Sequence, residues 1–450
     1  MERAILSDLV AWSESGDRKP LILCGARQVG KTWALRELGR LRYQNCVHVD
    51  LERQRDLHQL FASTHDARRL ISMLSVVAGQ AIRPGQTLLI LDEIQECPDA
   101  LTSLKYFYED APEYHVAAAG SLLGLALARP ASYPVGKVNI LDMYPLTLTE
   151  FLRATGNAPL ADYLRGIDAI GPIPDAIDGL LAEQLRYYLV VGGMPEAVAS
   201  WGSGHDVEGV EKVLGELLVL YQYDFHKHAE RVDPAKIDLV WESIPAQLAR
   251  ENKKFMYSIV RPSARAREYE SAVQWLVSAR ALLRVRRSKG PGLPLSAYDD
   301  ADAFKLYLFD VGMMRRHAGL DASACVQGDR LFTEFKGALT ENFVVQSLTA
   351  QLDRSRAPRY WASDNPRHEV DFLVQHANDV LPVEVKAGGN VRSPSMRHYR
   401  QEYAERTPLA VRLSLRNLAL DDGLLNVPLY LVDELPRLVD LALGQGAPGA

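Results

Sequence analysis

The chain has 450 residues, of which 47% are hydrophobic and 24% are charged, so a disordered or fibrous protein is excluded and two or three folded domains are expected. The formal net charge of −6 is no general signature of nucleic-acid binding, and any basic surface has to be local. No apolar run is long enough to span a bilayer, and the four cysteines form no CxxC pair. We therefore expect a cytoplasmic protein with no zinc site and no membrane partner.

A predicted buried strand at Leu21–Cys24 leads into a glycine-rich loop that reads GARQVGKT and is followed by a helical pattern. The loop fits GxxxxGK followed by Ser or Thr, and its glycines let backbone N–H groups surround a polyphosphate. Lys31 is expected to reach the β and γ phosphates and Thr32 to ligate Mg²⁺, while the helix N-terminus adds positive partial charge. The sequence therefore predicts binding of ATP or GTP. The predicted binding residues are Gly25, Ala26, Arg27, Gln28, Val29, Gly30, Lys31 and Thr32.

Apolar runs that alternate with helical patterns follow, which predicts a parallel sheet wrapped by helices. The further expected strands are Val47–Leu51, Thr87–Leu91 and His115–Ala119. The second of these runs into Asp92 and Glu93, at the end of a strand where ligands bind in open α/β sheets. We expect Asp92 to hold Mg²⁺ and Glu93 to orient and deprotonate the attacking water. Asp92 follows Lys31 by 61 residues (92 − 31), which leaves room for an extra strand and is typical of P-loop proteins with a catalytic glutamate.

The fourth predicted strand ends in the sequence AAGSLLG. Ser121 occupies the place where such ATPases carry a polar residue that senses the γ-phosphate, and we count it among the nucleotide-binding residues. A second interpretation is that Ser121 caps a helix at Leu122–Ala128. The two roles are compatible.

Five ordered motifs, GARQVGKT, LLILDEIQECPD, AAGSLLG, MYPLTLTEFL and YYLVVGGMPEAV, resemble a bacterial and archaeal family. Its members join an AAA-type ATPase core to a C-terminal region of unassigned function. The resemblance implies an α/β P-loop ATPase domain over residues 1–180 and ATP with Mg²⁺ as cofactors, and it is compatible with a homo-oligomer. Members usually carry Gly-Arg where this chain has Gly136 and Lys137. If that arginine contacts the nucleotide of a neighbouring subunit as an arginine finger, Lys137 is a poor substitute, because it lacks the planar guanidinium that binds two phosphate oxygens. Arg129 is the alternative candidate.

The middle region, residues 181–315, begins with helical patterns, and its segment YYLVVGGMPEAV predicts a tight turn between two helices that packs on the ATPase core. Residues 251–290 carry ten Lys and Arg against three Glu, a local balance of +7 (10 − 3). An amphipathic helix followed by LLRVRRSKGPG, read as a strand and a basic hairpin, suggests a winged-helix-like module that contacts a DNA backbone. The alternative is a solvated basic surface.

The C-terminal region, residues 316–450, carries acidic residues and a lysine in a spacing that suits phosphodiester chemistry. Glu341 lies in a helical pattern, Asp371 on an alternating strand, and Glu384 with Lys386 on one face of the next strand. If these strands are antiparallel neighbours, Asp371 and Glu384 would bind Mg²⁺ or Mn²⁺ through oxygen. Lys386 would position the attacking water, and Glu341 would support the metal from the helix.

This order of a helical Glu, a strand Asp and a strand ExK resembles the PD-(D/E)XK nuclease superfamily, which implies a restriction-endonuclease-like α/β domain. Two functions remain open. In the first, the chain hydrolyses ATP, binds DNA through residues 251–290 and the C-terminal domain, and cleaves the DNA at the C-terminal site. In the second, ATP drives a switch or DNA stimulates the ATPase, and the nuclease-like domain only binds.

Overall fold

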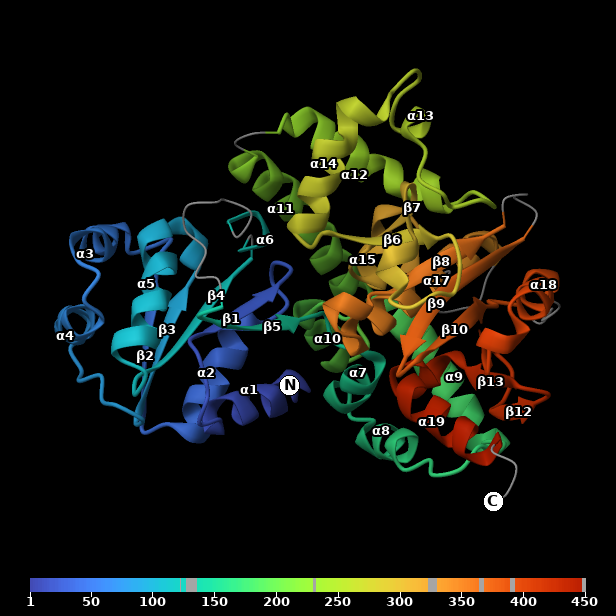
Figure 1. The fold of residues 1–450 in the computed structure, drawn as a ribbon, viewed down its shortest axis with the longest axis horizontal. Coiled ribbons are helices and arrows are strands. Elements are labelled where there is room, and N and C mark those ends of the chain that lie inside the picture. The colour runs from blue at the N-terminus through green and yellow to red at the C-terminus, as the bar shows by residue number, and fades with distance from the viewer. Residues whose placement is uncertain are drawn as a thin grey trace. The chain divides into compact units, whose positions relative to one another are not determined.

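The computed structural model describes residues 1–121, 123–126, 136–229, 232–322, 330–363, 368–388 and 393–446. Contacts divide the chain into two units (Figure 1). Unit 1 comprises Met1–Tyr144 together with the short segment Ser278–Ala281, and unit 2 comprises Pro145–Val277 and Leu282–Ala450. The middle and C-terminal regions therefore share one unit, whereas the division into three domains at residues 180 and 315 stays a prediction.

Unit 1 is built on a five-stranded parallel sheet, which confirms the predicted α/β class of this region. Its strands are β1 (Leu21–Gly25), β2 (Asn45–Asp50), β3 (Thr87–Asp92), β4 (His115–Gly120) and β5 (Asn139–Met143). They lie in the order β2-β3-β4-β1-β5, and every neighbouring pair is parallel. The first four were expected from their apolar runs. The half-exposed β5 was not, because only its last residue is buried.

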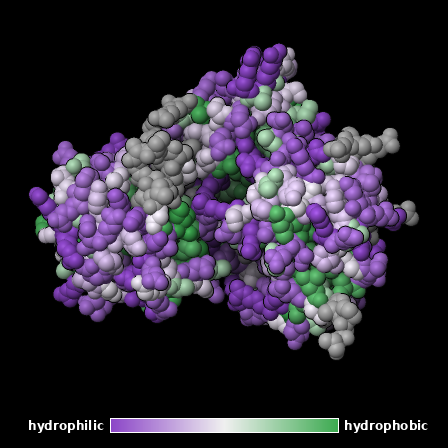
Figure 2. Space-filling view, viewed as in Figure 1, coloured by the Kyte–Doolittle hydropathy of each residue, from purple (hydrophilic) through white to green (hydrophobic). Residues whose placement is uncertain are grey.

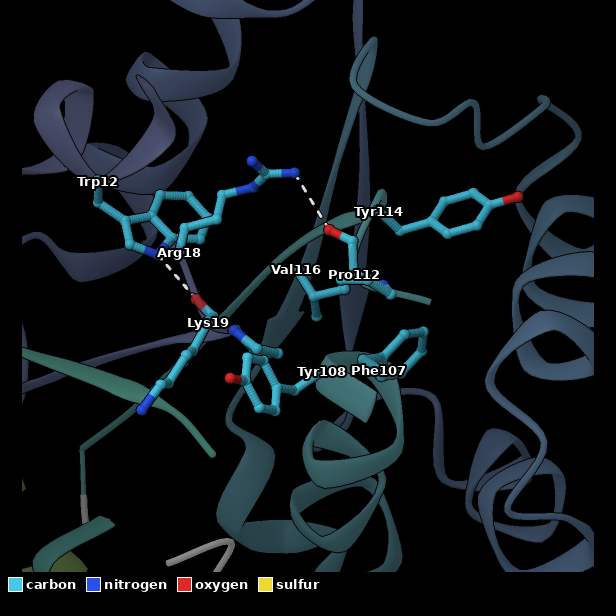
Figure 3. Close-up of a pocket in the computed structure, with 9 residues that line it drawn as sticks. Trp12, Arg18, Lys19, Phe107, Tyr108, Pro112, Tyr114 and Val116 are labelled. Atoms are coloured by element: carbon cyan, nitrogen blue, oxygen red, sulfur yellow. Dashed lines mark hydrogen bonds between the residues drawn. The ribbon is translucent and has the colours of Figure 1, made fainter. Parts of the chain in front are cut away.

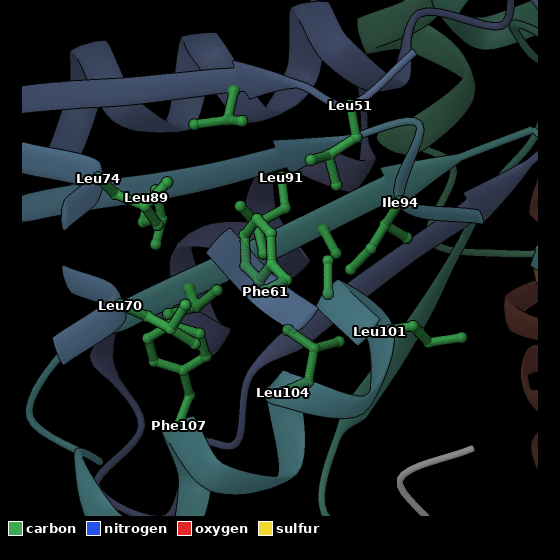
Figure 4. Packing of buried hydrophobic residues seen from close by; sticks show 14 of the residues in the cluster. Leu51, Phe61, Leu70, Leu74, Leu89, Leu91, Ile94, Leu101, Leu104 and Phe107 are labelled. Carbon is green, nitrogen blue, oxygen red and sulfur yellow. The ribbon is translucent and has the colours of Figure 1, made fainter. Parts of the chain in front are cut away.

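Helices cover this sheet. They are α1 (Ile5–Glu14), α2 (Lys31–Arg42), α3 (His58–Ser63), α4 (Ala67–Ala78), α5 (Pro98–Asp110) and α6 (Leu123–Ala126). Asp66 fixes the start of α4, since its carboxylate accepts hydrogen bonds from the backbone N–H groups of Arg68 and Arg69. Phe61 of α3 and Phe107 of α5 pack with Leu89 and Leu91 of β3 in one buried cluster (Figure 4). These apolar contacts hold the β3 strand, and hence its acidic end, against the helices on one side of the sheet.

Unit 2 is rich in helices, as the sequence predicted from about residue 180, but the first two helices end before that residue and were not predicted. The helices are α7 (Leu148–Ala154), α8 (Ala158–Arg165), α9 (Asp175–Val191), α10 (Pro195–Gly202), α11 (Val207–His228), α12 (Pro234–Leu248), α13 (Tyr257–Val260), α14 (Ala266–Ser278) and α15 (Val311–His317). Further along the described part of the chain lie α17 (Arg330–Gln351), α18 (Pro394–Glu402) and α19 (Leu435–Gly446). Within the described parts of the chain, no helix combines the length and the apolar character that crossing a membrane requires. Hydrophilic side chains cover most of the face in Figure 2, with small hydrophobic groups between them.

An eight-stranded mixed sheet forms the centre of unit 2. Its strands are β6 (Leu282–Ser288), β7 (Asp299–Leu308), β8 (Arg359–Ala362), β9 (Glu369–His376), β10 (Asp379–Val385), β11 (Ala410–Ser414), β12 (Ala419–Asp421) and β13 (Leu424–Pro428). Their order is β12-β13-β11-β10-β9-β8-β6-β7. The strand and hairpin expected in the basic middle region do form, as β6 and β7. However, β6 pairs with β8 and extends the sheet of the C-terminal region, so these strands do not make the separate winged helix that was predicted.

The turn in YYLVVGGMPEAV joins α9 to α10, as predicted. The backbone N–H of Leu146, which lies in unit 2 and within the ATPase domain predicted for residues 1–180, donates to the carbonyl oxygen of Gly193 at 2.7 Å. Gly192 has φ of 73°, and a Cβ there would lie 2.3 Å from a carboxylate oxygen of Asp310. The backbone N–H of Gly193 donates to Asp310 at 2.6 Å, and that of Met313 donates to the same side chain at 2.9 Å. Asp310, which starts α15, is fully buried. The motif is therefore a packing device in which two glycines let the turn close on a buried carboxylate.

Replacing Asp310 tests this packing through its pH dependence. Burial raises the pKa of Asp310 to about 6, although hydrogen bonds from Gly193 and Met313 oppose it. An unfolded Asp has a pKa of about 3.9, so the unfolded chain releases a proton between about pH 4 and 6 that the folded protein keeps. Stability attributable to Asp310 is thus present below pH 4 and is lost as the pH rises to 6.

Asp310→Asn should have a lower melting temperature throughout, because an amide offers one acceptor oxygen where two N–H groups donate. Its melting temperature should also change less than that of the parent between pH 4 and 6, measured by scanning calorimetry. The exposed Asp302→Asn serves as the control. Equal pH slopes for the parent and Asp310→Asn would contradict the assignment.

Candidate functional site

The glycine-rich loop connects β1 to α2 and is shaped by its two glycines. A Cβ on Gly25 would lie 2.4 Å from the carbonyl oxygen of Met143 on β5, so a side chain there would push β1 and β5 apart. Gly30 has φ of 99° and is the residue before α2, a left-handed conformation that other residues adopt at a cost. The chain therefore turns within the loop and starts a helix at Lys31, which directs the first N–H groups of α2 toward the loop.

Lys31 lies inside the loop. Its side chain is only 7% exposed, and Nζ donates to the carbonyl oxygens of Gly25 at 3.1 Å and Ala26 at 2.8 Å. Burial lowers the pKa of Lys31 to about 8, although the negative charges of Glu93 and Asp92 oppose this effect. An ammonium group held inside a loop of backbone amides has the position and charge that phosphate oxygens require.

Thr32 and Asp92 meet at the edge where the parallel strands end. The hydroxyl of Thr32 donates to Oδ2 of Asp92 at 2.8 Å. Burial alone would raise the pKa of Asp92, but hydrogen bonds from His48 and Thr32 outweigh burial and lower it. Asp92 is therefore a carboxylate at neutral pH, beside a hydroxyl, and these oxygens are ligands that Mg²⁺ accepts.

His48 was not among the predicted site residues, yet it contacts Asp92. Its Nε2 lies 3.0 Å from Oδ2 of Asp92, and its Nδ1 lies 3.2 Å from a guanidinium nitrogen of Arg36. Because a guanidinium can only donate, Nδ1 accepts and Nε2 carries the proton that it donates to Asp92. His48 therefore orients the carboxylate. A histidine on a half-exposed strand gave no signal of this in the sequence.

Glu93 follows Asp92 in a left-handed conformation, with φ of 46°. Its Oε2 accepts hydrogen bonds from Nε2 of Gln95 at 2.7 Å and from the hydroxyl of Ser121 at 3.3 Å. The structure thus brings Ser121, at the end of β4, to the carboxylate that was expected to activate water. A backbone strained at this position is commonly found at functional sites, because it aims a side chain. The helix expected at Leu122–Ala128 lies partly outside the described residues.

Two arginines near the loop were also missed by sequence reasoning. The guanidinium of Arg3 donates to the carbonyl oxygens of Val29 at 2.9 Å and Tyr144 at 2.6 Å, and so ties the loop to the end of β5. Arg280, in the short C-terminal segment of unit 1, forms an ion pair of 2.5 Å with Asp142 of β5. Burial is the main cause of the lowered pKa of Lys31, and the positive charge of Arg280 lowers it further. Both arginines come from far along the chain, where no local pattern points to the loop.

Lys137, which stands where the resembling family has arginine, is engaged within unit 1. Its Nζ forms an ion pair of 3.1 Å with Glu109 and lies 5.2 Å from the centre of the Tyr108 ring. Tyr108 also lines a small pocket with Trp12 and Arg18 (Figure 3). That pocket holds about 10 Å³, which is enough for a water molecule at most and not for a nucleotide. Arg129 lies outside the described residues.

The C-terminal acidic residues lie in a buried network of opposite charges. Glu341 of α17 is bonded to the ammonium of Lys253 and accepts a hydrogen bond of 3.2 Å from the hydroxyl of Tyr307. Lys305 is fully buried and forms an ion pair of 2.5 Å with Glu369. Burial would lower the pKa of Lys305, but the negative charges of Glu369, Glu341 and Asp371 raise it. Lysines 253 and 305 were not predicted to belong to this site.

Asp371, Glu384 and Lys386 are also brought together, where β9 and β10 pair. The backbone N–H of Val385 donates to Oδ2 of Asp371 at 2.8 Å, and Nζ of Lys386 lies 2.5 Å from Oε1 of Glu384. Burial, with the charges of Glu341 and Glu384, raises the pKa of Asp371 to about 8. Oε2 of Glu384 is buried and has no hydrogen-bond partner among the described residues.

The metal site expected at Asp371 and Glu384 is not confirmed. Over the described part of the chain, no three His, Cys, Asp or Glu side chains are grouped so that they could hold a metal ion. Glu341, Glu369 and Glu384 each form an ion pair with a lysine. These lysines partly neutralise the negative charge that a metal cation would otherwise neutralise.

Fewer cationic side chains in the basic stretch 251–290 are available to bind DNA than its composition suggested, because several form ion pairs within the protein. Five of its ten cationic residues form ion pairs with acidic side chains: Lys253, Arg280, Arg284, Arg286 and Arg287. Arg284 also stacks over the ring of Phe304, at 4.6 Å. Much of this positive charge therefore stabilises the fold, and DNA contact by the stretch stays a prediction.

Comparisons with known proteins identify the N-terminal part of the chain. A family model described as an AAA domain matches residues 17–152. Two others, a Domain of unknown function (DUF8612) and a Domain of unknown function (DUF4143), match residues 182–324 and 336–432. No curated protein matches the chain. With the parallel sheet and the loop, the first match shows an AAA-type P-loop ATPase domain, whereas the nuclease-like C-terminal domain is not confirmed.

Solved structures that resemble the chain include a Walker-type ATPase of Pyrococcus abyssi, with 15% identity and a TM-score of 0.45 over 70% of this chain and 95% of that one. The RuvB Holliday junction branch migration motor of Thermotoga maritima has 15% identity and a TM-score of 0.29, over 63% and 90%. AMPPCP-bound DnaA from Aquifex aeolicus has 12% identity and a TM-score of 0.26, over 61% and 85%.

His48→Ala should raise the Mg²⁺ concentration that ATP turnover requires, because Asp92 loses the donor that orients it. Loss of such an outer partner typically lowers metal affinity by about 10- to 100-fold. The measurement is the Mg²⁺ concentration that gives half-maximal ATP turnover. Arg36→Ala is the matched control, since it removes the outer neighbour of His48 and leaves the bond to Asp92. An unchanged Mg²⁺ requirement in His48→Ala would rule out this positioning role.

Proposed function

We propose that the chain binds and hydrolyses ATP, and that unit 1 holds the catalytic residues. The observation that supports this most strongly is the 2.8 Å hydrogen bond between Thr32 of the loop and Asp92 of β3, with Lys31 buried in the same loop. A chance glycine-rich turn would not bring a hydroxyl, a carboxylate and an ammonium together at the carboxyl-end edge of one parallel sheet.

Each residue then has a distinct role. The backbone N–H groups from Gly25 to Thr32 and the ammonium of Lys31 hold the β and γ phosphates. Glu93 accepts a proton from the attacking water, and Ser121, hydrogen-bonded to that carboxylate, holds it in place until the γ-phosphate is present. Mg²⁺, when bound beside Thr32 and Asp92, would supply neutralisation of phosphate charge. We also propose that the active protein is a homo-oligomer, as AAA-type ATPases commonly are.

Two substitutions test these roles. Lys31→Ala should abolish measurable nucleotide binding, because the loop loses its only buried ammonium among the described residues. Glu93→Gln should bind ATP as the parent does but lower its turnover by about 100-fold or more, since an amide cannot accept the proton. Binding is measured with a fluorescent ATP analogue and turnover by phosphate release.

Glu96→Gln, on the same turn as Glu93, is the control and should keep parental turnover. If Glu93→Gln also turns over ATP at the parental rate, another group is the base.

The second candidate function is metal-dependent cleavage of DNA by the C-terminal cluster. It is supported by the convergence of Asp371 with Glu384 and Lys386, and by the buried Oε2 of Glu384 that lacks a partner within the described residues. Such a carboxylate oxygen is costly to bury unless a ligand occupies it at some stage. Mg²⁺ or Mn²⁺ would have to compete with the lysine charges for Asp371 and Glu384. A switch, or a DNA-stimulated ATPase without cleavage, is the alternative.

Cleavage assays separate these alternatives. Plasmid and single-stranded DNA are incubated with Mg²⁺ or Mn²⁺, with and without ATP. The nuclease proposal expects Glu384→Ala and Lys386→Ala to lose at least about 100-fold of the cleavage rate, because the reacting centre loses its charge stabilisation. Asp379→Ala, at the other end of β10, should cleave as the parent does.

If no metal supports cleavage by the parent while ATP turnover persists, the C-terminal region is a binding domain. If cleavage occurs but Glu384→Ala retains it, a contaminant or another site is responsible.

A further inference from the structure

A hollow of about 560 Å³ lies in unit 2 between α18, β11 and the start of β13. Three arginines line it: Arg397 and Arg400 from α18, and Arg412 from β11. Met396 and Leu424 supply apolar wall, and Asp422 is the one acidic residue among its lining side chains. The hollow therefore combines positive charge with an apolar surface, which is the usual make-up of a site for a polar ligand with a carbon framework.

The arginines of this hollow are not neutralised in the way that those of the basic stretch are. Arg400 donates to the backbone carbonyl oxygen of Asp422 at 2.6 Å, and Arg412 donates to the amide oxygen of Asn426 at 3.0 Å. Both acceptors are uncharged. Within the described chain, neither arginine nor Arg397 forms an ion pair with a carboxylate. Three guanidinium groups thus line the hollow, and the hydrogen bonds of Arg400 and Arg412 position two of them while leaving their charge for a ligand.

Arg412 carries a further sign of an absent partner. Its Nε is buried and lacks any hydrogen-bond partner among the residues that the structure describes. A buried N–H that donates to nothing costs free energy, and native proteins retain few of them. Burial, together with the charge of Arg416, lowers the pKa of Arg412, whereas Glu384 raises it. An anion in the hollow would satisfy the Nε donor and offset the burial of the positive charge.

The hollow adjoins the strand that carries Glu384 and Lys386. Arg412 of β11 is the direct partner of Glu384 in the parallel register of β10 and β11, and side chains at paired positions point to the same face of a sheet. Its neighbour Asn426 on β13 is in turn paired with Arg412. Three adjacent strands therefore carry, side by side, a carboxylate, a guanidinium and an amide that holds the guanidinium in place.

We propose that this hollow binds a phosphate-bearing ligand of nucleotide size, with Arg397, Arg400 and Arg412 holding the phosphate. An orthophosphate alone would leave most of 560 Å³ unfilled, whereas this volume is within the range of about 300–1,000 Å³ that small-molecule sites occupy. Met396 and Leu424 would contact the sugar or base. The ligand is either a free nucleotide or one unit of a nucleic-acid strand, since the two share this chemistry. If the ligand is a nucleic-acid strand, the inference rests on the proposed DNA function. If the ligand is a free nucleotide, it does not.

The test measures binding by the full chain in a Lys31→Ala background, so that the ATPase loop does not contribute. Two probes distinguish the sources: thymidine monophosphate by calorimetry, and a fluorescein-labelled 12-nucleotide single strand by anisotropy. Arg397→Ala/Arg412→Ala should weaken binding of at least one probe by about tenfold or more, as expected for loss of charge-assisted hydrogen bonds. For the strand, the slope of log affinity against log salt should fall by about 0.7 for each phosphate group that the variant no longer neutralises.

Arg354→Ala/Arg356→Ala, two exposed arginines outside the hollow, is the matched control and should leave binding unchanged. Arg412→Lys guards against misfolding, since it keeps the charge but loses the planar fork, and should give intermediate binding. Weakening of thymidine monophosphate alone assigns the site to free nucleotides, and weakening of the strand assigns it to nucleic acid. Equal binding of both probes by the double variant and the control overturns the proposal.

The cleavage function is tested separately by Glu384→Ala, which removes a carboxylate and leaves the three arginines. Loss of cleavage with parental binding in Glu384→Ala supports both assignments. Parental cleavage in Glu384→Ala, combined with weakened binding in the arginine variant, contradicts the nuclease and supports the hollow.

Discussion

The order of the strands in unit 1 is the constraint on which the nucleotide site depends. Because β4 lies between β1 and β3, the glycine-rich loop and the acidic end of β3 are not on neighbouring strands, yet Thr32 and Asp92 meet at 2.8 Å. The same β4 is followed directly by Ser121, which contacts Glu93. All strands are parallel, so their carboxyl ends, and the charged side chains that follow them, gather at one edge. Apolar packing of β3 against α3 and α5 holds this strand, and therefore Asp92 at its end, in position beside the loop.

Unit 2 shows two different uses of charge. In the buried network, lysines accompany the carboxylates of Glu341, Glu369 and Glu384, because isolated charges are costly in a low-dielectric interior. In the hollow beside Arg412, cationic side chains have neutral partners and keep their charge exposed to a ligand. The first arrangement stabilises a fold and the second is organised for binding. The two arrangements lie close together because β10 pairs with β11, in a region that a Domain of unknown function (DUF4143) model matches.

Local sequence patterns predicted those parts of the structure that depend on neighbours in the chain. The apolar runs before Gly25 and Asp92 form buried strands because alternation is not needed when both faces of a sheet are covered. By contrast, β5 has a half-exposed pattern and was missed. The basic strand β6 was predicted to belong to a separate winged-helix-like module. No pattern in residues 282–288 indicates that β8, more than 70 residues further along the chain, is its parallel partner.

The sequence by itself determined the glycine-rich loop, the acidic end of β3 and the parallel α/β class of unit 1, because each follows from residue types at fixed short spacings. It also identified the acidic residues and Lys386 of the C-terminal region, but not the lysines, Lys253 and Lys305, that pair with the acidic residues. Only the tertiary structure decided that His48 orients Asp92, that Lys253 and Lys305 neutralise the buried carboxylates, and that Arg412 stands beside Glu384. These pairings join residues far apart in the chain, and strand register and burial, which no local pattern encodes, bring them into contact.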